Sequence, residues 1–417
     1  MSNLRKYKFS DLYEISSGIS SKPEQAGHGF PFLSFSTVFN NHFLPSSLPD
    51  LMDTSEKERK TYSIKEGDVF LTRTSETLDE LAMSSVAICD APNATYSGFL
   101  KRLRPNQTDI TYNKFMAFYL RSKLFRKTMT NNAIMTLRAS FNEQIFSYLD
   151  LLLPEFESQK NIGDLLFLLN EKIELNNKIN AELEAMAKLI YDYWFVQFDF
   201  PNANGKPYKS SGGNMVYNEE LKREIPDGWE VGTLLDIAIF TNGIACQKHR
   251  PVDNEKHYKV IKIREMGSGF TEKSELVSQR IPKKVVVNDG DILFSWSATL
   301  DVKIWTGGIG GLNQHIFKVT SDEYPRTYYY FEVLRYLQHF KMIAELRKTT
   351  MGHITQDHLK QSRISIPTKK LIGDLHNKID PILNKIVKSK EENLKLVHLR
   401  DWLLPMLMNG QVTIKND

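Results

Sequence analysis

The chain has 417 residues, with 54 Lys and Arg against 50 Asp and Glu and a formal net charge of +4. This length exceeds what one hydrophobic core ordinarily serves, so we expect two or three domains. No apolar run approaches the roughly 18 residues that a bilayer span needs, which excludes a helical membrane protein. The near balance of charge does not indicate a polyanionic partner, but it allows one if the basic residues cluster.

The first residues, "MSNLRKYKFSDLYEI", lack the apolar core of a signal peptide, and Cys89 and Cys246 are the two cysteines of the chain. Disulfides are rare in reducing compartments, and this sequence offers no cysteine framework. We therefore expect a soluble cytoplasmic protein without disulfides.

The first predicted domain comprises residues 1–154. Short runs of apolar, β-branched and aromatic residues, such as "SFSTVF" and "DVFLT", alternate with Gly, Pro, Asn and Asp. This pattern predicts strands joined by turns. A helical stretch around 113–127 interrupts the strands, which favours an α+β domain.

A long central spacer helix is predicted for 155–200. One row of residues recurs every seven positions and comprises Ile162, Leu169, Asn176, Leu183 and Ile190. A second row lies three positions later and comprises Leu165, Lys172, Ile179, Met186 and Tyr193. Apolar residues in two rows of a heptad predict a coiled coil. About 30 residues of helix would extend on the order of 45 Å.

After a linker, predicted for 201–227, the second half of the chain repeats the first. The segment "EGDVFLTRTS" (66–75) returns as "DGDILFSWSA" (289–298), and the phrase "IGDL" occurs at 162–165 and at 372–375. The spacing between matched segments falls steadily from 225 to 210 along the chain, as collinear copies with small insertions and deletions require. The sequence therefore predicts a second α+β domain at 228–367.

The second copy also ends in a spacer helix, predicted for 368–410. Its seam residues are Ile372, Leu375, Ile379, Ile382, Ile386, Asn393, Leu396 and Leu403, together with Ser389 and Arg400. Asp380-Pro381 lies within the pattern. Because Asp is a common N-cap and Pro a common first helical residue, the helix could restart or kink at this point.

Two matched heptad helices favour mutual pairing over burial of each helix on its own domain. In an antiparallel pair Asn176 and Asn393 would meet near the middle of the seam. We hypothesise that they set the register of the pair at some cost in stability. The expected architecture is two pseudo-symmetric α+β domains joined by two long antiparallel coiled-coil helices.

Several segments resemble the specificity (S) subunits of type I restriction-modification systems. The helical run "IGDLLFLLNEKIELNNKINAELEAMAKLIYDYWF" is similar to their central helical region, and "IPDGWEVGTL" to the start of their second target-recognition domain. "GDILFSWSA", "GLNQHIFKV" and "MGHITQDHLKQSRISIP" match recurring patterns of those domains. The first copy departs from them, because "NNAIMTLRASF" lacks the glycine found at Gly352. The resemblance covers essentially the whole chain.

This resemblance implies a non-catalytic subunit. Each recognition domain would read one half of a bipartite site in double-stranded DNA. The helices would set the gap between the halves and dock two modification (methyltransferase) subunits. No cofactor is implied for this chain, since S-adenosylmethionine would bind the modification subunits. ATP and magnesium would act on restriction subunits, where these are present.

Motifs for chemistry are sparse in the sequence. There is no Asn/Asp-Pro-Pro-aromatic tetrad of amino-group methylation, and no Walker A motif, since Gly205-Lys206 is followed by proline. Histidine and cysteine show no metal-ligand spacing. Pro49-Asp50 and Glu58-Arg59-Lys60 imitate a metal-dependent nuclease, but the polar run "DTSEKERKT" favours a solvated loop or short helix.

Reading DNA needs Arg or Lys for guanine, Asn or Gln for adenine, and basic groups for phosphates. The candidates in the first copy are Lys22, Arg73, Thr74, Lys101, Arg102, Arg104 and Arg138. The candidates in the second copy are Gln247, Lys248, His249, Arg250, Lys262, Arg264, Ser295, Trp296, Asn313, Gln314 and His315. We favour Arg73 and Arg250 for base contacts. Each candidate is also explained by an ordinary solvated surface position.

A structural adaptor is the alternative prediction. Two similar domains on a coiled coil could bridge two protein partners without touching DNA. The small net charge favours the adaptor, whereas the basic clusters and the resemblance favour DNA. Salt dependence of binding would discriminate between them, because phosphate contacts make affinity fall steeply with salt.

Overall fold

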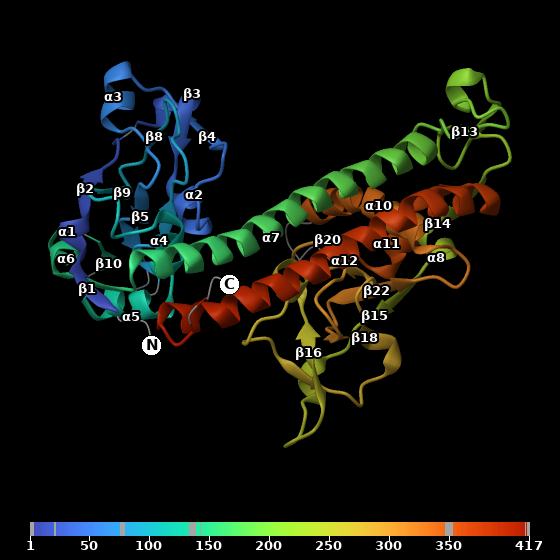
Figure 1. Cartoon of the computed structure of the whole chain (residues 1–417). Coiled ribbons are helices and arrows are strands. Elements are labelled where there is room, and N and C mark those ends of the chain that lie inside the picture. Colours follow the sequence, from blue (N-terminus) through green and yellow to red (C-terminus); the bar gives the residue numbers. More distant parts are fainter. Residues whose placement is uncertain are drawn as a thin grey trace. The chain divides into compact units, whose positions relative to one another are not determined.

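The computed structural model describes residues 4–20, 22–75, 80–132, 139–141, 143–346, 353–412 and 414 (Figure 1). The chain forms two compact units. Unit 1 comprises Met1–Ile173 and Leu396–Asp417, and unit 2 comprises Glu174–Lys395. Within the described ranges, no helix is both long enough and apolar enough to cross a bilayer.

Unit 1 is built on a four-stranded antiparallel sheet of order β2-β9-β5-β7. Its strands are Tyr13–Ser17, Leu100–Pro105, Val69–Thr72 and Ser84–Val86. A second sheet has the order β4-β3-β8 (Asp50–Met52, Ala26–Leu33, Thr95–Tyr96). Two ladders pair β1 (Arg5–Lys8) with β11 (Asp150–Leu153) and β6 (Thr74–Ser75) with β10 (Ala139–Ser140). The short helices are α1 (Phe9–Leu12), η1 (Pro23–Gln25), α2 (Phe35–Asn40), α3 (Glu56–Thr61), α4 (Asn113–Tyr119), α5 (Lys123–Asn132) and α6 (Glu143–Tyr148).

Unit 2 has a main sheet of order β15-β22-β19-β20. Its strands are Ile239–Asn242, Ile316–Thr320, Ile292–Ser295 and Asp301–Ile304. A second sheet has the order β17-β16-β21-β18 (Leu276–Ser278, His257–Ile261, Gly310–Leu312, Val286–Val287). Two ladders pair β14 (Glu230–Thr233) with β23 (Arg363–Ile366) and β12 (Met215–Asn218) with β13 (Arg223–Pro226). The helices are η4 (Lys209–Ser211), α8 (Leu234–Ile237), η5 (Cys246–His249), α9 (Ile263–Ser268), η6 (Lys283–Val285), α10 (Arg326–Leu346) and α11 (Gln356–Gln361).

The predicted duplication is confirmed by the topology. Both main sheets are antiparallel throughout, and each second sheet contains one parallel pair, β3-β8 in unit 1 and β16-β21 in unit 2. In unit 1 β1 pairs with β11, and in unit 2 β14 pairs with β23; β11 and β23 are the strands that directly precede the two long helices. The predicted α+β class is therefore also correct.

The repeated Gly-Asp pair performs one structural task in both units. Gly67 and Gly290 adopt positive φ values of 83° and 90°, which glycine tolerates best. Asp68 then accepts two hydrogen bonds of 2.7 Å from the Arg104 guanidinium. Asp291 lies 2.7 Å from Lys318 Nζ. In each unit an acid at the start of one central strand is thus joined to a cation on the neighbouring strand.

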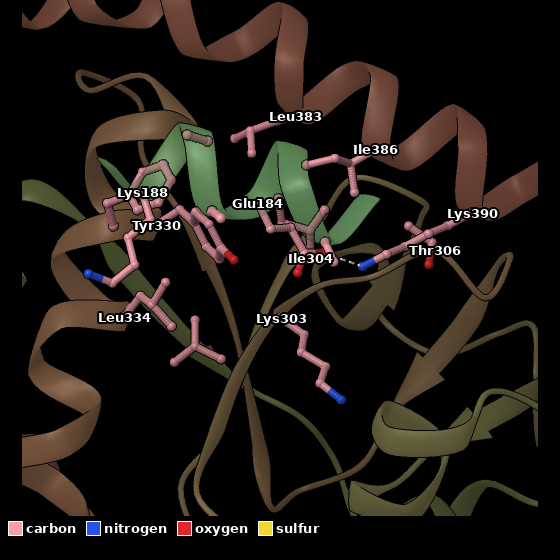
Figure 2. Close-up of a pocket in the computed structure, with 15 residues that line it drawn as sticks. Glu184, Lys188, Lys303, Ile304, Thr306, Tyr330, Leu334, Leu383, Ile386 and Lys390 are labelled. Atoms are coloured by element: carbon pink, nitrogen blue, oxygen red, sulfur yellow. Dashed lines mark hydrogen bonds and ion pairs between the residues drawn. The ribbon is translucent and has the colours of Figure 1, made fainter. Parts of the chain in front are cut away.

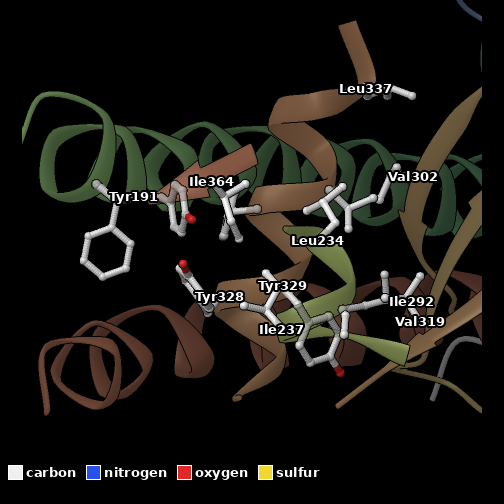
Figure 3. Close-up of a cluster of buried hydrophobic side chains, with 14 of the residues drawn as sticks. Tyr191, Leu234, Ile237, Ile292, Val302, Val319, Tyr328, Tyr329, Leu337 and Ile364 are labelled. Atoms are coloured by element: carbon white, nitrogen blue, oxygen red, sulfur yellow. The ribbon is translucent and has the colours of Figure 1, made fainter. Parts of the chain in front are cut away.

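The core of unit 2 brings together side chains from distant segments (Figure 3). Tyr191 and Tyr328 are buried there beside Leu234 and Ile237 of α8, with sheet residues such as Ile292 completing the cluster. Unit 1 has an equivalent core in which α4 packs against the main sheet. Burial of these side chains supplies most of the driving force for folding.

Two long helices take part in both units. Helix α7 spans Phe156–Tyr191 and continues into a π-helical turn, Asp192–Val196, while α12 spans Lys369–Met408. Helix α12 passes through Pro381 without a break, so it does not restart there. Proline removes only one backbone hydrogen bond, and the buried Ile379 and Leu383 on either side hold the segment in one helix.

The helices are antiparallel in unit 2. Asn176 Nδ2 donates to Asn393 Oδ1 at 2.8 Å, and Lys390 Nζ lies 2.7 Å from Glu184 Oε1. Asn393 in turn donates to Asn177 Oδ1 at 2.9 Å. The predicted meeting of the two asparagines is confirmed.

One predicted row of α7 is wrong. The buried second row lies four positions after the first, not three, and comprises Leu166, Ile173, Asn180, Ala187 and Trp194. Ile179 and Met186 are instead 39% and 44% exposed, and Leu165 is only half-buried. The reason is tertiary, because the small Ala187 lets α7 pack closely on the core of unit 2. The seam row of α12 is buried at Ile372, Leu375, Ile379, Ile386 and Asn393.

Candidate nucleic-acid interface

In each unit, three backbone hydrogen bonds connect four separate segments at one end of the main sheet. In unit 1 the Arg73 N–H donates to Phe99 O (2.9 Å), the Phe141 N–H to Arg73 O (2.8 Å) and the Gly98 N–H to Ile19 O (2.7 Å). We call the surface formed by Arg73, Thr74 and Phe99 the first tip.

Unit 2 repeats these bonds with other residues. The Trp296 N–H donates to His315 O (3.3 Å), the Ile354 N–H to Trp296 O (2.9 Å) and the Gln314 N–H to Ile244 O (2.9 Å). We call the surface formed by Trp296, Gln314, His315 and His353 the second tip. The two tips therefore share one backbone frame.

A close backbone approach fixes this frame in both units. A Cβ atom on Gly18 would lie 2.3 Å from Ser97 O, and one on Gly243 would lie 2.2 Å from Asn313 O. Real Cβ atoms do not come this close to backbone atoms, so only glycine fits. The two glycines matched in the duplicated sequence are thus the residues that form the base of each tip.

The first tip presents a cation and an aromatic ring. Arg73 is exposed just beyond the end of β5, and the Phe99 side chain is 66% exposed. Thr74 is half-buried in β6. An exposed guanidinium is able to donate two hydrogen bonds to guanine, and an exposed ring is able to contact a thymine methyl group.

The second tip is a cluster of interlocked rings. Trp296 Nε1 donates to Asn242 Oδ1 at 3.1 Å. The Trp296 ring centroid lies 5.5 Å from that of His315 and 5.3 Å from that of His353. Gln314 Nε2 lies 3.3 Å from His315 Nε2. The cluster offers aromatic faces together with amide and imidazole groups that donate and accept hydrogen bonds.

Basic residues follow both tips along the chain. The segment after Ile19 contains the exposed Lys22, and the segment after Ile244 contains η5 with the following arginine. The exposed side chains of that second segment are Gln247, Lys248, His249 and Arg250. Positive charge beside each tip suits a polyanion.

Ser295 and Asn313 do not face solvent, which corrects their prediction as base-reading residues. Ser295 is 0% exposed, and its hydroxyl donates to Thr299 O at 2.6 Å. Asn313 is 7% exposed, and its side-chain oxygen accepts from the His315 N–H at 3.4 Å. Both side chains hold the turns that carry the second tip.

The three predicted cations of β9 are engaged inside unit 1. Lys101 Nζ donates to Ser17 Oγ at 2.8 Å, and Arg102 Nη1 donates to Ser63 O at 2.7 Å. Arg104 binds Asp68, and these hydrogen bonds raise the pKa of the Arg104 guanidinium. The strand is central in its sheet, so these side chains are tied to neighbouring elements and are poor candidates for contacting a base.

Two further cations of unit 2 also have acidic partners. Lys262 Nζ lies 2.5 Å from Glu275 Oε1, and Arg264 Nη2 lies 2.5 Å from Glu265 Oε1. Glu265 is buried, and Arg264 is bonded to it at the start of α9. Arg138 lies outside the described residues.

Three residues at the tips were missed from sequence: Phe99, His353 and Asn242. Phe99 holds the place of the predicted residue His315 in the repeated frame, so the repeat offered a positional signal for Phe99. Asn242 aligns with Ser17, which no sequence pattern indicated. The ring contact of His353 with Trp296 depends on the folded chain, so no sequence pattern indicated it.

The nuclease-like segment forms a capped short helix. Ser55 and Glu58 form a capping box at the start of α3, and these hydrogen bonds lower the pKa of the Glu58 carboxyl. Lys60 Nζ lies 2.7 Å from Glu56 Oε1. Across the described part of the chain, no group of three or more His, Cys, Asp or Glu side chains is gathered as a metal site.

A pocket of about 470 Å³ lies between α7, α10, α12 and β20 in unit 2 (Figure 2). Tyr330, Leu334, Leu383 and Ile386 give it apolar walls. Lys390 lies at its edge, joined to Glu184. The pocket is therefore an apolar recess with an ion pair at its edge.

Comparison with known proteins identifies a family whose model matches both halves of the chain. The family model described as "Type I restriction modification DNA specificity domain" matches residues 1–185 and 226–396. The chain belongs to this family. Its general function is therefore DNA recognition within type I restriction-modification, as the sequence resemblance predicted.

Two curated relatives match nearly the full chain. The MjaIX specificity subunit of a type I restriction enzyme from Methanocaldococcus jannaschii is 23% identical, over 98% of this chain and 93% of its own length. The HindI specificity subunit from Haemophilus influenzae is 24% identical, over 99% of this chain and 100% of its own length. The crystal structure of a type I S subunit from M. genitalium has a TM-score of 0.61 at 11% identity, covering 97% of this chain and 96% of that chain. This last likeness shows the specificity-subunit fold.

Proposed function

We propose that the chain is the sequence-specificity subunit of a type I restriction-modification complex and that each tip reads one half of a bipartite DNA site. The observation that carries the proposal is the shared backbone frame of the two tips with different side chains on it. Such an arrangement reads two different base sequences in one geometry.

The tips differ in the bases that they suit. Arg73 at the first tip fits guanine, whose O6 and N7 accept a bidentate guanidinium. Gln314 at the second tip and Gln247 in the segment after Ile244 fit adenine, because an amide donates to N7 and accepts from N6. Lys22 and Lys248 fit phosphates on either side, where they fix position without reading sequence, and the exposed Arg250 fits a guanine.

The long helices act as the spacer between half-sites in this proposal. Helix α7 has 36 residues, or about 54 Å at 1.5 Å per residue. Half-sites on one face of B-DNA are about 34 Å apart, or one helical turn. The helix is long enough to set such a gap.

The outward face of α7 is suited to docking the modification subunits. Leu175, Ile179, Met186 and Leu189 are between 39% and 65% exposed along it. Apolar side chains aligned on one helix face are typical of a protein-binding surface. The adaptor alternative uses the same face, so this surface alone does not separate the two functions.

The chain itself performs no reaction in this proposal. The modification subunits bind S-adenosylmethionine and methylate an adenine in each half-site, and restriction subunits, where present, use ATP and magnesium. The residues of this chain bind and orient the DNA.

The decisive experiment co-expresses the chain with a modification subunit and maps methylated adenines in genomic DNA. The expected result is a split motif with a fixed gap, in which the Arg73→Ala variant relaxes only one half. Binding of purified complex to a duplex should also weaken log-linearly with salt. An active methyltransferase whose methylation pattern does not depend on this chain would refute the proposal. A chain that binds its protein partners independently of salt and does not bind DNA would also refute it, in favour of the adaptor.

A further inference from the structure

A cationic cavity lies in unit 2 outside the second tip. It has a volume of about 400 Å³ and is formed by the β12–β13 hairpin, α10 and the start of β23. Its lining includes Arg223, Arg335, Arg363, His339, Tyr336 and Glu220. Three guanidinium groups from three different elements therefore face one cavity.

The acidic groups around this cavity do not balance its cations. Arg335 Nη2 lies 2.9 Å from Glu332 Oε2, and Glu332 is 1% exposed beneath the cavity. Tyr191 donates to the other oxygen of Glu332 at 2.5 Å. Burial raises the pKa of Glu332. The three guanidinium groups thus have two carboxylate partners, Glu332 and Glu220.

Arg223 is the cation that is least compensated. It donates to the neutral Ser365 hydroxyl at 3.2 Å and lies over the Phe198 ring. Burial, and then the charge of Arg335, lowers the pKa of Arg223. Arg363 has a carboxylate partner, Glu220, at 3.3 Å, but both side chains are more than half exposed, so water screens this pair. An anion between these arginines would relieve their repulsion.

We propose that this cavity binds the phosphate group of a nucleotide, either within the DNA backbone or free in solution. Guanidinium groups match phosphate oxygens with paired hydrogen bonds, and they do so better than ammonium groups. The cavity exceeds the size of a phosphate, so it also has space for the attached sugar, with the Tyr336 and His339 rings beside it. Binding of a DNA backbone phosphate rests on the proposed function, whereas binding of a free nucleotide does not.

Calorimetric titration of the full chain with inorganic phosphate and with thymidine monophosphate tests the free ligand. Arg363→Gln and His339→Gln are the variants of choice, because both side chains are exposed and the fold should survive. We expect the Arg363→Gln affinity for the nucleotide to fall about tenfold. Lys370→Gln, which removes an exposed cation of α12 away from the lining, is the matched control and should change nothing.

Binding to a duplex without the recognition motif, measured over a range of salt, tests the DNA source. If a backbone phosphate occupies the cavity, the slope of log Kobs against log salt becomes shallower by about 0.9 in Arg363→Gln and not in the control. A loss of nucleotide affinity in the variants supports a site for the free nucleotide. A shallower slope in Arg363→Gln supports a site for a DNA backbone phosphate. Unchanged slopes together with no nucleotide binding overturn it. A chain that directs no methylation but binds the nucleotide through Arg363 would refute the proposed function and leave this site standing.

Discussion

The first and second tips have the same backbone frame, but their side chains are held in different ways. Arg73 and Phe99 project from the first tip into solvent, whereas Trp296 is fixed by Asn242, His315 and His353. The frame depends on one glycine and on backbone hydrogen bonds, so it does not constrain the side chains that it carries. If the tips read DNA as we propose, sequence specificity is able to change at a tip without a change of fold.

The two units also differ in the ion pairs of their main sheets. The Asp68–Arg104 and Asp291–Lys318 pairs occupy equivalent places in the two sheets, yet Asp68 is fully buried and the Asp291 side chain is 23% exposed. Equivalent interactions should thus differ in their contribution to stability.

The largest effect is expected from Asp68→Asn compared with Asp291→Asn. The first change leaves the Arg104 guanidinium without its buried carboxylate and should cost about 3–5 kcal/mol. The second pair is partly solvated, so its loss should cost about 1–2 kcal/mol. Hydrogen exchange of peptides from each main sheet measures the two separately, because the units need not unfold together.

Asp374→Asn is the control for these variants, since Asp374 is exposed on α12. It should leave exchange in both sheets unchanged. Equal losses in Asp68→Asn and Asp291→Asn would mean that burial of the pair does not determine its contribution.

The two "IGDL" segments should respond in opposite directions to the same substitution. A Cβ on Gly163 would lie 2.7 Å from the Phe115 backbone nitrogen, whereas a Cβ on Gly373 would meet nothing within 4 Å. Gly163→Ala should therefore destabilise unit 1 by about 1–3 kcal/mol through overpacking of α7 on α4. Gly373→Ala should stabilise α12 by up to about 1 kcal/mol. Thermal unfolding of both variants tests this, and a stabilised Gly163→Ala would contradict the close packing.

Alanine variants of the tips should change different halves of the DNA site. Arg73→Ala should relax one base position of one half at a cost of about 1–3 kcal/mol in binding. Trp296→Ala should affect only the other half, because its partners all lie in unit 2. Methylation mapping of both variants in the complex gives the readout. If both variants altered the same half-site, the tips would not be separate readers.

The class of fold could be predicted from sequence because local and repeated sequence patterns indicate it. The collinear repeat and the heptads of α7 and α12 are visible without any contact information. The second buried row of α7 could not be recognised in this way. The row that is buried contains Asn180 and Ala187, whereas the row predicted from sequence contains the more apolar Ile179 and Met186. Packing against the core of unit 2 decides which row is buried, and sequence spacing does not carry that information.

The candidate site was harder to predict than the fold. Lys101, Arg102 and Arg104 form a basic cluster in sequence, but they are hydrogen-bonded to Ser17 of β2 and to Ser63 and Asp68 in the segment before β5. Phe99 gave no chemical signal, because an exposed phenylalanine is recognised only when the fold shows that it is exposed. Arg73 and Arg250 were predicted because arginine is a residue type that reads guanine, and both are exposed in the structure.

The smallest expected effect concerns the seam between the helices. Asn176 and Asn393 are 4% and 8% exposed, and they are hydrogen-bonded to each other and to Glu392 and Asn177. Replacing both with Leu exchanges a buried polar pair for apolar packing and should raise the melting temperature by a few degrees, or about 1 kcal/mol. Asn393→Leu alone should lower it, because Asn176 then loses an acceptor in a buried place. The double variant could instead be no more stable than the original chain and still pair its helices in one register. In that case the asparagines contribute packing and hydrogen bonding and are not needed for register. A double variant that is more stable and yet directs methylation at more than one gap length would show that these residues fix the spacing.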